Sequence, residues 1–319
     1  MLRSTQIANM INVSVPRVKQ LIKENDFKVL KKNKKSTRVI FPHQTVKNLL
    51  NLRGFSYERN IVTIGQEKGG VGKSLLTFNV AVNMSQRGAK VLIIDLDPES
   101  CITSLILTEE QLDSDYGTIY EVLKDKIQFK DVLLKSRYEG IDVVPCRGVA
   151  RRADRLVADD NPKKTLKKYM KGLEEYDLIL FDVPPTFTRL ISSAYLTSDL
   201  VIMPTFPDSW SIESLHLTID DIVNDCEQFD SELPELRVLM NKYSFSRHAS
   251  KEAWKQVTED FGKYLLPFQI KESAALQNLV NDGKSIYETG SFGDIKDALD
   301  CLCDTICPLN QQAAVDVDQ

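Results

Sequence analysis

A glycine-rich segment that follows an apolar stretch carries the clearest chemistry in this sequence. Residues 65–74 read Gly-Gln-Glu-Lys-Gly-Gly-Val-Gly-Lys-Ser, and a helix-like pattern follows from Leu75. Glycines allow successive backbone N–H groups to surround a phosphate, and the next helix adds the positive end of its dipole. In such a loop Lys73 reaches the β- and γ-phosphates of a nucleotide and Ser74 ligates Mg²⁺. The other predicted nucleotide contacts in the loop are Gly69, Gly70, Val71, Gly72 and Leu75.

A second lysine makes this loop unusual. Lys68 precedes the Gly-Gly pair, and Glu67 stands where a standard phosphate loop has glycine. Two ammonium groups in one loop repel each other unless a polyanion lies between them. We therefore predict that Lys68 and Lys73 both act on a polyphosphate. A chance glycine-rich turn is the alternative, and the strand, the helix and both lysines together disfavour it.

Carboxylates follow two of the apolar segments directly. Residues 91–94 lead into Asp95-Leu96-Asp97-Pro98, and residues 178–181 lead into Asp182. The carboxyl ends of strands are where open α/β sheets bind ligands. A carboxylate there can hold the water that attacks the γ-phosphate, and the family resemblance described below implies this role for Asp95. Asp182, with Asp97 and the loop serine, is predicted to hold Mg²⁺.

Apolar segments alternate with helical patterns beyond residue 60, which predicts the fold that positions these groups. Continuous apolar strands are typical of a parallel sheet buried on both faces. We predict a doubly wound, mostly parallel α/β P-loop NTPase domain over residues 56–309. The six predicted strands cover residues 61–64, 91–94, 141–144, 178–181, 200–203 and 236–240.

The first part of the chain has a different charge. Residues 1–59 contain thirteen Lys and Arg against three acidic residues, whereas the rest carries 28 basic and 42 acidic residues. Helical patterns at 4–10 and from Ser14 to about residue 25 have helix-turn-helix spacing, with Asn12 in the turn and Ser14 as an N-cap. We expect DNA contacts from the outward side chains of the second helix, which are Arg17, Lys19, Gln20 and Lys23.

A basic hairpin and a third helix complete the predicted winged helix-turn-helix domain of residues 1–55. Short strands at 28–30 and 37–41 flank a lysine-rich turn, and a helix at about 43–52 leads to a linker at 53–56. The residues expected to meet phosphate in this wing are Lys31, Lys32, Lys34, Lys35 and Arg38. An ordinary helical pair beside a solvated lysine loop is the alternative, which the coincident charge disfavours.

Cysteines and apolar runs exclude other classes of protein. None of the six cysteines forms a Cys-x-x-Cys pair, so we expect reduced thiols and no zinc site. Cys301, Cys303 and Cys307 lie in the pattern of an amphipathic final helix, which indicates packing. No run approaches the roughly 20 apolar residues of a membrane span, and the N-terminus lacks a signal peptide, so we expect a cytoplasmic protein. Residues 310–319 are polar and predicted to be disordered.

These motifs in this order resemble those of the ParA family of partition ATPases. The loop resembles the deviant Walker A motif, Lys-Gly-Gly-x-x-Lys-[Ser/Thr], and the likeness covers residues 60 to about 306. It implies that Lys68 crosses an ATP-sandwiched homodimer to the partner's phosphates. It also implies that Pro207, Asp208 and Asn241 lie near the nucleotide base, and that Lys271 contacts DNA non-specifically.

The N-terminal helix-turn-helix is similar to that of the larger plasmid members. The resemblance implies a weak Mg²⁺-dependent ATPase, stimulated by DNA and by a centromere-binding partner protein. Such a protein is cytoplasmic and nucleoid-associated, positions plasmid cargo and represses its own operon. Glu99 and Leu75 depart from the family's usual Gln and Thr, which leaves the rate of hydrolysis open.

Three other functions are weighed against partition. A nucleotide-gated transcriptional repressor would bind its operator without stimulated hydrolysis. A MinD-type membrane ATPase needs a basic amphipathic helix at the C-terminus, and residues 310–319 do not form one. An iron–sulfur reductase on this fold needs bridging cysteines beside the nucleotide loops, which the sequence lacks.

Overall fold

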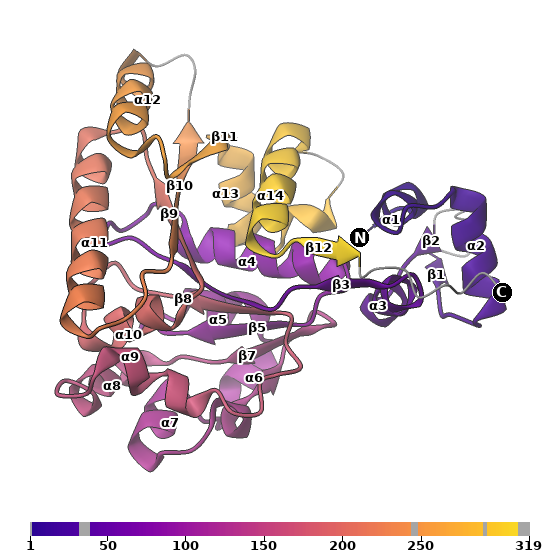
Figure 1. The fold of residues 1–319 in the computed structure, drawn as a ribbon. Coiled ribbons are helices and arrows are strands. Elements are labelled where there is room, and N and C mark those ends of the chain that lie inside the picture. Colours follow the sequence, from indigo (N-terminus) through magenta and orange to yellow (C-terminus); the bar gives the residue numbers. More distant parts are fainter. Residues whose placement is uncertain (1, 32–38, 244–247, 290–291, 312–319) are drawn as a thin grey trace.

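The computed structural model describes residues 2–31, 39–243, 248–289 and 292–311, and consists of an α/β body with a small helical unit at one end (Figure 1). The helical unit is formed by the N-terminal residues and lies beyond the C-terminal end of helix α4, Lys73–Gln86. The mostly parallel α/β architecture predicted from the apolar pattern is confirmed.

A sheet of eight strands forms the centre of the body. Its strand order is β11-β10-β9-β4-β8-β5-β7-β6, and each neighbouring pair is parallel except β6 and β7. All six predicted strands are present; β6 and β11 were not predicted, because one is very short and the other is an edge strand with mixed burial. The strands are β4 Asn60–Ile64, β5 Val91–Asp95, β6 Leu134–Lys135, β7 Ile141–Val144, β8 Leu178–Asp182, β9 Leu200–Thr205, β10 Glu235–Tyr243 and β11 Leu265–Lys271.

Alternate residues of each strand enter two separate hydrophobic cores. In β5, Val91 and Ile93 pack into one core while Leu92 and Ile94 pack into the other. This is the pattern of a sheet covered on both faces. The first core includes helices α4, α5 Cys101–Ile106, α13 Ala274–Asn281 and α14 Gly293–Ile306; the second includes α7 Ile119–Asp125, α8 Ala153–Leu156, α10 Arg189–Thr197, α11 Ser209–Gln228 and α12 His248–Phe261.

Shorter helices connect these elements. The remaining α-helices of the body are α6 Glu109–Asp113 and α9 Pro162–Thr165, and the 3₁₀ segments are η1 Phe129–Val132, η2 Gly148–Arg152, η3 Lys167–Tyr169 and η4 Ile286–Glu288. The final helix α14 buries the apolar stripe predicted for it, together with Cys303 and Cys307, whereas Cys301 is exposed. All six cysteines are free thiols. Within the described residues, none of the helices has the length and apolar character to cross a membrane.

The N-terminal unit contains α1 Ser4–Met10, α2 Val15–Glu24, the paired two-residue strands β1 Leu30–Lys31 and β2 Val39–Ile40, and α3 His43–Leu52. The Ser14 hydroxyl caps α2 by accepting the backbone N–H of Arg17, and Asn12 adopts a positive φ of 52° in the preceding turn. Val18 and Leu21 are buried in the unit's own core. The helices lie where we predicted them, while the predicted strands at 28–30 and 37–41 are present only in part, as β1 and β2, and their turn lies outside the described residues. The winged helix-turn-helix assignment stays a prediction.

Two boundaries differ from prediction. Strand β3, Phe55–Tyr57, begins inside the predicted linker and pairs antiparallel with β12, Leu309–Gln311. The prediction of disorder from residue 310 is therefore wrong for Asn310 and Gln311, and residues 312–319 lie outside the described residues. This pairing joins segments far apart in the chain. Neither three-residue strand has a local sequence pattern from which the pairing could be predicted.

Candidate active site

The phosphate loop lies between β4 and α4, as its sequence predicts. Gly70 and Gly72 have φ values of 76° and 96°, in the region that favours glycine. A Cβ atom on Gly72 would lie 2.6 Å from Nδ2 of Asn241. That amide donates a hydrogen bond of 2.7 Å to the carbonyl oxygen of Val71. Asn241, predicted to lie near the base, thus also supports the backbone of the loop.

Lys73 points inward across the loop. Its Nζ donates to the carbonyl oxygen of Lys68 at 3.1 Å, and the residue is only 6% exposed. Burial lowers the pKa of Lys73, and the carboxylates of Asp182 and Asp97 oppose that shift. A buried cation held by a single neutral acceptor is well placed to bind a phosphate oxygen.

Asp182 ends β8 directly beside the start of α4. Its Oδ2 accepts a hydrogen bond of 2.7 Å from the Ser74 hydroxyl, and its Oδ1 accepts one of 3.2 Å from the Thr77 hydroxyl. Burial raises the pKa of Asp182 to about 7, although both hydroxyls stabilise its charge. The nearby Lys73 compensates this charge only in part, and a divalent cation would add positive charge.

Asp95 lies opposite Asp182 in the register of β5 and β8. Its Oδ2 accepts from the hydroxyl of Thr103 at 2.6 Å and from the same residue's N–H at 3.2 Å, and its Oδ1 accepts the N–H of Asp97 at 3.0 Å. The side chain is fully buried, and burial together with Asp182 raises the pKa of Asp95 well above its usual range. In this arrangement it orders the segment after β5, because it binds the N–H of Asp97 and both donors of Thr103.

These groups fit Mg²⁺. A serine hydroxyl and buried carboxylates supply the oxygen ligands that Mg²⁺ prefers, and this ion usually keeps several waters and substrate phosphates in its shell. Over the described ranges, no group of three His, Cys, Asp or Glu side chains forms a closed metal cage. The predicted set of Ser74, Asp97 and Asp182 is therefore suited to an ion shared with a nucleotide, which would help to stabilise charge on the phosphates.

Lys68 is held within its own chain. Its Nζ donates to Oδ1 of Asp208 at 2.7 Å and to the hydroxyl of Ser211 at 2.8 Å. Asp208 also caps α11 by accepting the N–H of Ser211 at 2.9 Å. Partial burial opposes its charge, but the bonds from Lys68 and Ser211 keep the pKa of Asp208 below its usual range. Asp208, predicted to lie near the base, is thus a partner of Lys68, and the adjacent Pro207 is half-buried.

A cavity of about 420 Å³ opens beside the first turn of α4. Two of its lining residues, Leu75 and Asn241, were predicted to contact nucleotide. Lys271, predicted to contact DNA, also lines this cavity, and its Nζ pairs with Asp294. Its other lining residues are Lys242, Glu272, Ser273, Ala274 and Leu276.

Apart from Lys271, the residues predicted to contact DNA lie far from this loop, in the N-terminal unit. Lys19, Gln20 and Lys23 are exposed on α2, and Arg17 is half-exposed. Glu24 accepts hydrogen bonds from Gln20 at 2.6 Å and from Arg17 at 3.4 Å, so this face of α2 carries one acid. Lys31 ends β1, while Lys32, Lys34, Lys35 and Arg38 lie outside the described residues.

Sequence reasoning missed several supporting residues. Thr77 and Thr103 bind the two buried aspartates, and Ser211 completes the contact of Lys68. Lys242 donates to the carbonyl oxygen of Gly70 at 3.4 Å. Thr77 carries a usable signal, because it lies four positions after Lys73 and so on the same face of α4. Glu99, the departure noted above, forms an exposed ion pair of 2.7 Å with Arg151.

Fold and loop together define a P-loop nucleotide-binding protein, and comparison with known proteins specifies the family. A family model described as an AAA domain, AAA_31, matches residues 59–235. The chain belongs to this ParA/Soj family of P-loop ATPases.

Two relatives illustrate the extent of the likeness. The chromosome partitioning protein ParA of Myxococcus xanthus is 25% identical over 245 residues, which cover 76% of this chain and 86% of that protein. The uncharacterized protein Rv1708 of Mycobacterium tuberculosis is 29% identical over 206 residues. That alignment covers 63% of this chain and 64% of the relative's length.

Solved structures agree on the fold. A plasmid partition protein from Borrelia burgdorferi bound to AMPPNP is 25% identical with a TM-score of 0.63, over 77% of this chain and 97% of that one. The ATP complex of a McdA variant from Cyanothece reaches a TM-score of 0.71 at 23% identity, over 81% and 100%. Cobyrinic acid a,c-diamide synthase from Mycobacterium smegmatis, with an ATP analogue and magnesium, has a TM-score of 0.65 at 19% identity, over 77% and 93%. The expectation of ATP and Mg²⁺ as cofactors is confirmed at the level of such homologues.

Proposed function

We propose that this protein is an ATP-dependent dimer switch that positions DNA cargo such as a plasmid. The contact between Lys68 and Asp208 carries the proposal. Lys73 already supplies the cation that a single chain brings to its phosphates, and Lys68 is held 2.7 Å from an acid in its own chain. A lysine that is held beside the loop of one chain, and is not needed by that chain's own phosphates, is available to bind the nucleotide of a second chain.

In the proposed dimer, Lys68 of each chain reaches the phosphates bound by the other chain. Lys73, the partner's Lys68 and Mg²⁺ would together neutralise charge that develops on the phosphoryl oxygens. ATP would hold the dimer together and hydrolysis would release it. We propose Asp95 as the residue associated with the attacking water and Asp182 as the acid that supports Mg²⁺.

The partners we propose are DNA and a centromere-binding protein. The exposed cations of α2 support contact with operator DNA and repression of the chain's own operon, and the dimer would also bind DNA non-specifically. The partner protein would stimulate an otherwise weak ATPase, and the likeness to plasmid partition proteins from Borrelia burgdorferi supports a role in partition. The proposed location is the cytoplasm, in association with the nucleoid.

ATP turnover of the wild type and of Lys68→Ala tests this proposal. Each is measured with and without non-specific DNA and the product of the adjacent downstream gene. We expect weak basal turnover, stimulation by DNA and partner together, and loss of stimulation in Lys68→Ala. The control is Lys255→Ala, which removes an exposed lysine from α12.

The second candidate is a nucleotide-gated transcriptional repressor, which the N-terminal unit supports. It predicts operator binding that depends on nucleotide while turnover stays negligible under every combination. That result would overturn the partition proposal, whereas stimulated turnover that survives in Lys68→Ala would overturn the role given to this lysine.

A further inference from the structure

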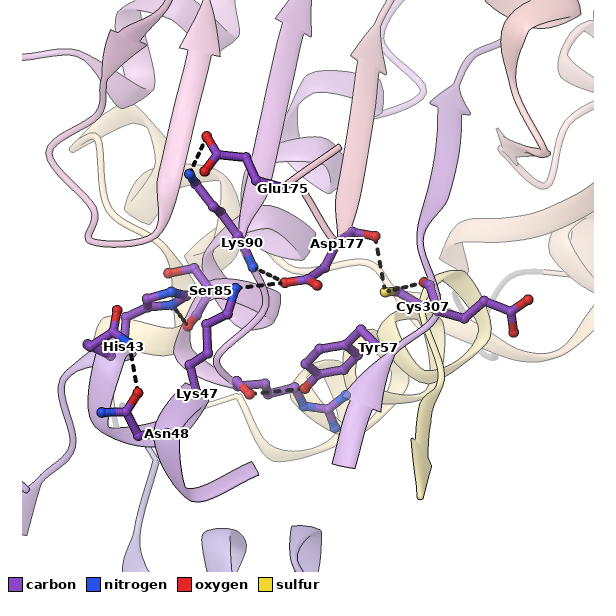
Figure 2. Close-up of polar contacts among 12 residues, drawn as sticks. His43, Lys47, Asn48, Tyr57, Ser85, Lys90, Glu175, Asp177 and Cys307 are labelled. Carbon is purple, nitrogen blue, oxygen red and sulfur yellow. Dashed lines mark hydrogen bonds and ion pairs between the residues drawn. The ribbon is translucent and has the colours of Figure 1, made fainter. Parts of the chain in front are cut away.

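One face of α3 in the N-terminal unit packs on the ATPase body. His43 and Lys47, one helical turn apart, both make polar contacts across this boundary (Figure 2). Nδ1 of His43 lies 2.9 Å from the carbonyl oxygen of Ser85, and Nζ of Lys47 lies 3.5 Å from Oδ2 of Asp177. The backbone N–H of His43 also donates to Glu139 at 3.1 Å. These contacts fix both the position and the rotation of α3.

Two glycines of the body form the surface on which α3 rests. Gly88 and Gly140 have φ values of 91° and 83°. A Cβ atom on Gly88 would lie 2.9 Å from the backbone nitrogen of Lys47, and one on Gly140 would lie 2.4 Å from Nδ1 of His43. Side chains are therefore excluded at both positions, by backbone conformation and by the closeness of α3. The helix approaches the body to backbone contact distance, which a loosely tethered module would not require.

The pairing of β3 with β12 forms a second attachment. These strands join the end of the N-terminal unit to the segment that follows α14. The hydroxyl of Tyr57 in β3 donates to the carbonyl oxygen of Arg87 at 3.0 Å, immediately after α4. The thiol of Cys307 reaches the carbonyl oxygen of Glu58 (Figure 2). The connection between the two parts is thus hydrogen-bonded on both sides.

Helix α4 supports both attachments and begins at the phosphate loop. Its 14 residues span roughly 21 Å, from Lys73 at the nucleotide site to the last turn, where Ser85 contacts α3. Asn83 braces the helix laterally by donating to Asp300 of α14 at 2.7 Å, and Asn79 accepts the Ser285 hydroxyl at 2.9 Å. The nucleotide site and the N-terminal unit therefore lie at opposite ends of one braced helix.

Helix α1 contributes much less to this joint. A polar cavity of about 540 Å³ lies between α1 and the body, lined by Arg3 and Asn9 on one side and by Asn83 and Lys296 on the other. The position of the N-terminal unit is accordingly set by α3 and β3. Helix α2, which carries the exposed cations, lies on the outer side of the unit, away from the body (Figure 1).

We propose that α3 and β3 hold the N-terminal unit and the P-loop helix as one body, so that an ATP-bound dimer presents two copies of α2 at a fixed separation and orientation. The dimer would then bind DNA that has two-fold-related half-sites. The packing of α3 against Gly88 and Gly140 would set the spacing of these half-sites. Dimeric helix-turn-helix proteins match half-site spacing in this way, whereas flexibly tethered units accept many spacings. This inference rests on the proposed ATP-dependent dimer and adds the symmetry of the DNA and the residues that determine it.

Distance measurements between spin labels on the two copies of α2 test the inference. The exposed Lys19 is replaced by cysteine and labelled, with the exposed Cys101 and Cys301 replaced by serine. Pulsed electron paramagnetic resonance is recorded with AMPPNP and Mg²⁺. We expect one narrow distance distribution, and one about twice as broad when His43→Ala and Lys47→Ala are combined.

Two variants make the result specific. Gln44→Ala is the matched control, since it changes an exposed side chain beside His43 and should leave the distribution narrow. Lys47→Ala alone is the milder test, because this half-buried lysine can be lost with the helix intact, and we expect an intermediate width. Nucleotide binding should be unchanged in every variant, since none of these residues touches the phosphate loop.

The outcomes separate this inference from the function on which it rests. A broad distance distribution in the wild-type dimer would overturn the proposal that α3 fixes the N-terminal unit, and so would a narrow one that persists in the double variant. Neither result would contradict the proposed dimer switch. Sedimentation of the same labelled sample reports the dimer itself. A chain that stays monomeric with AMPPNP would overturn the proposed function and the inference together.

Discussion

Replacing Asp208 with asparagine should make ATP-dependent dimerisation easier. Lys68 donates to Asp208 at 2.7 Å and to Ser211 at 2.8 Å, and both bonds must break before this lysine can reach another chain's phosphates. The ion pair therefore stabilises the single chain against the proposed dimer. Asp208→Asn removes the charge and weakens that competing contact.

The magnitude follows from the exposure of the pair. The side chains of Lys68 and Asp208 are 27% and 40% exposed, so solvent screens part of their attraction. Pairs of this kind contribute about 0.5–1 kcal/mol. Two such contacts open when a dimer forms, which gives about 1–2 kcal/mol and a dimer dissociation constant roughly 5- to 30-fold lower.

Asparagine suits this test because it preserves the helix cap. Asp208 accepts the backbone N–H of Ser211 at the start of α11, and asparagine caps helices about as well as aspartate. We therefore expect α11 to stay intact and the melting temperature to fall only by the loss of this ion pair, about 1–4 °C. The dimer dissociation constant is measured by analytical ultracentrifugation with AMPPNP and Mg²⁺, beside Glu213→Gln, which removes an exposed acid from the same helix.

The reasoning would be refuted by one result in particular. A dissociation constant for Asp208→Asn that equals or exceeds the wild-type value, in a protein that remains folded, would mean that Asp208 does not restrain Lys68. An equal gain in Glu213→Gln would show a general effect of net charge instead.

Two further predictions concern the phosphate loop and its acids. The pKa of Asp182 is raised to about 7 in the folded chain without ligand, so between about pH 4 and pH 7 this chain retains a proton that the unfolded chain releases. The stability that this proton contributes is fully present below about pH 4 and is lost as the pH rises through 7. Calorimetry of the ligand-free protein should show a smaller loss of stability from about pH 5 to about pH 8 in Asp182→Asn than in the wild type, and an equal or larger loss would contradict the assignment. Gly72→Ala should cost about 1–3 kcal/mol and weaken ATP binding, because φ is 96° and the new methyl group would lie 2.6 Å from Asn241. Isothermal titration with ATP and chemical denaturation measure both effects, and wild-type values in both would show that the loop tolerates a side chain there.

Local sequence patterns predicted much of this molecule. The six apolar strands and the helix after the phosphate loop have sequence periods that reflect burial on two faces, so their positions could be predicted from the sequence. Ser14 and Asn12 marked the turn before α2 for equally local reasons, a capping hydroxyl and a tolerated positive φ. The edge strands β6 and β11 were missed, because partial burial leaves a weak pattern.

Contacts between residues far apart in the chain could not be predicted from such local patterns. The resemblance placed Asp208 near the nucleotide base, which stays a prediction, and the structure shows its contact with Lys68, 140 residues earlier in the chain. Lys271, whose contact with DNA stays a prediction, pairs with Asp294 beside the cavity. Any exposed lysine can meet phosphate or a nearby acid, and only the folded arrangement decides between them.

The sequence by itself determined the P-loop ATPase class, because a phosphate loop, its lysines and its serine must be adjacent in the chain to surround one phosphate. The strands and their terminal acids were determined in the same way, since burial and strand ends leave local patterns. Only the tertiary structure decided how the N-terminal unit is attached. Helix α3 packs against Gly88 and Gly140, and β3 pairs with β12. Both contacts join segments far apart in the chain, and no local sequence pattern relates these segments. Such contacts depend on complementary shape and on backbone hydrogen bonds, which come into existence when the chain has folded.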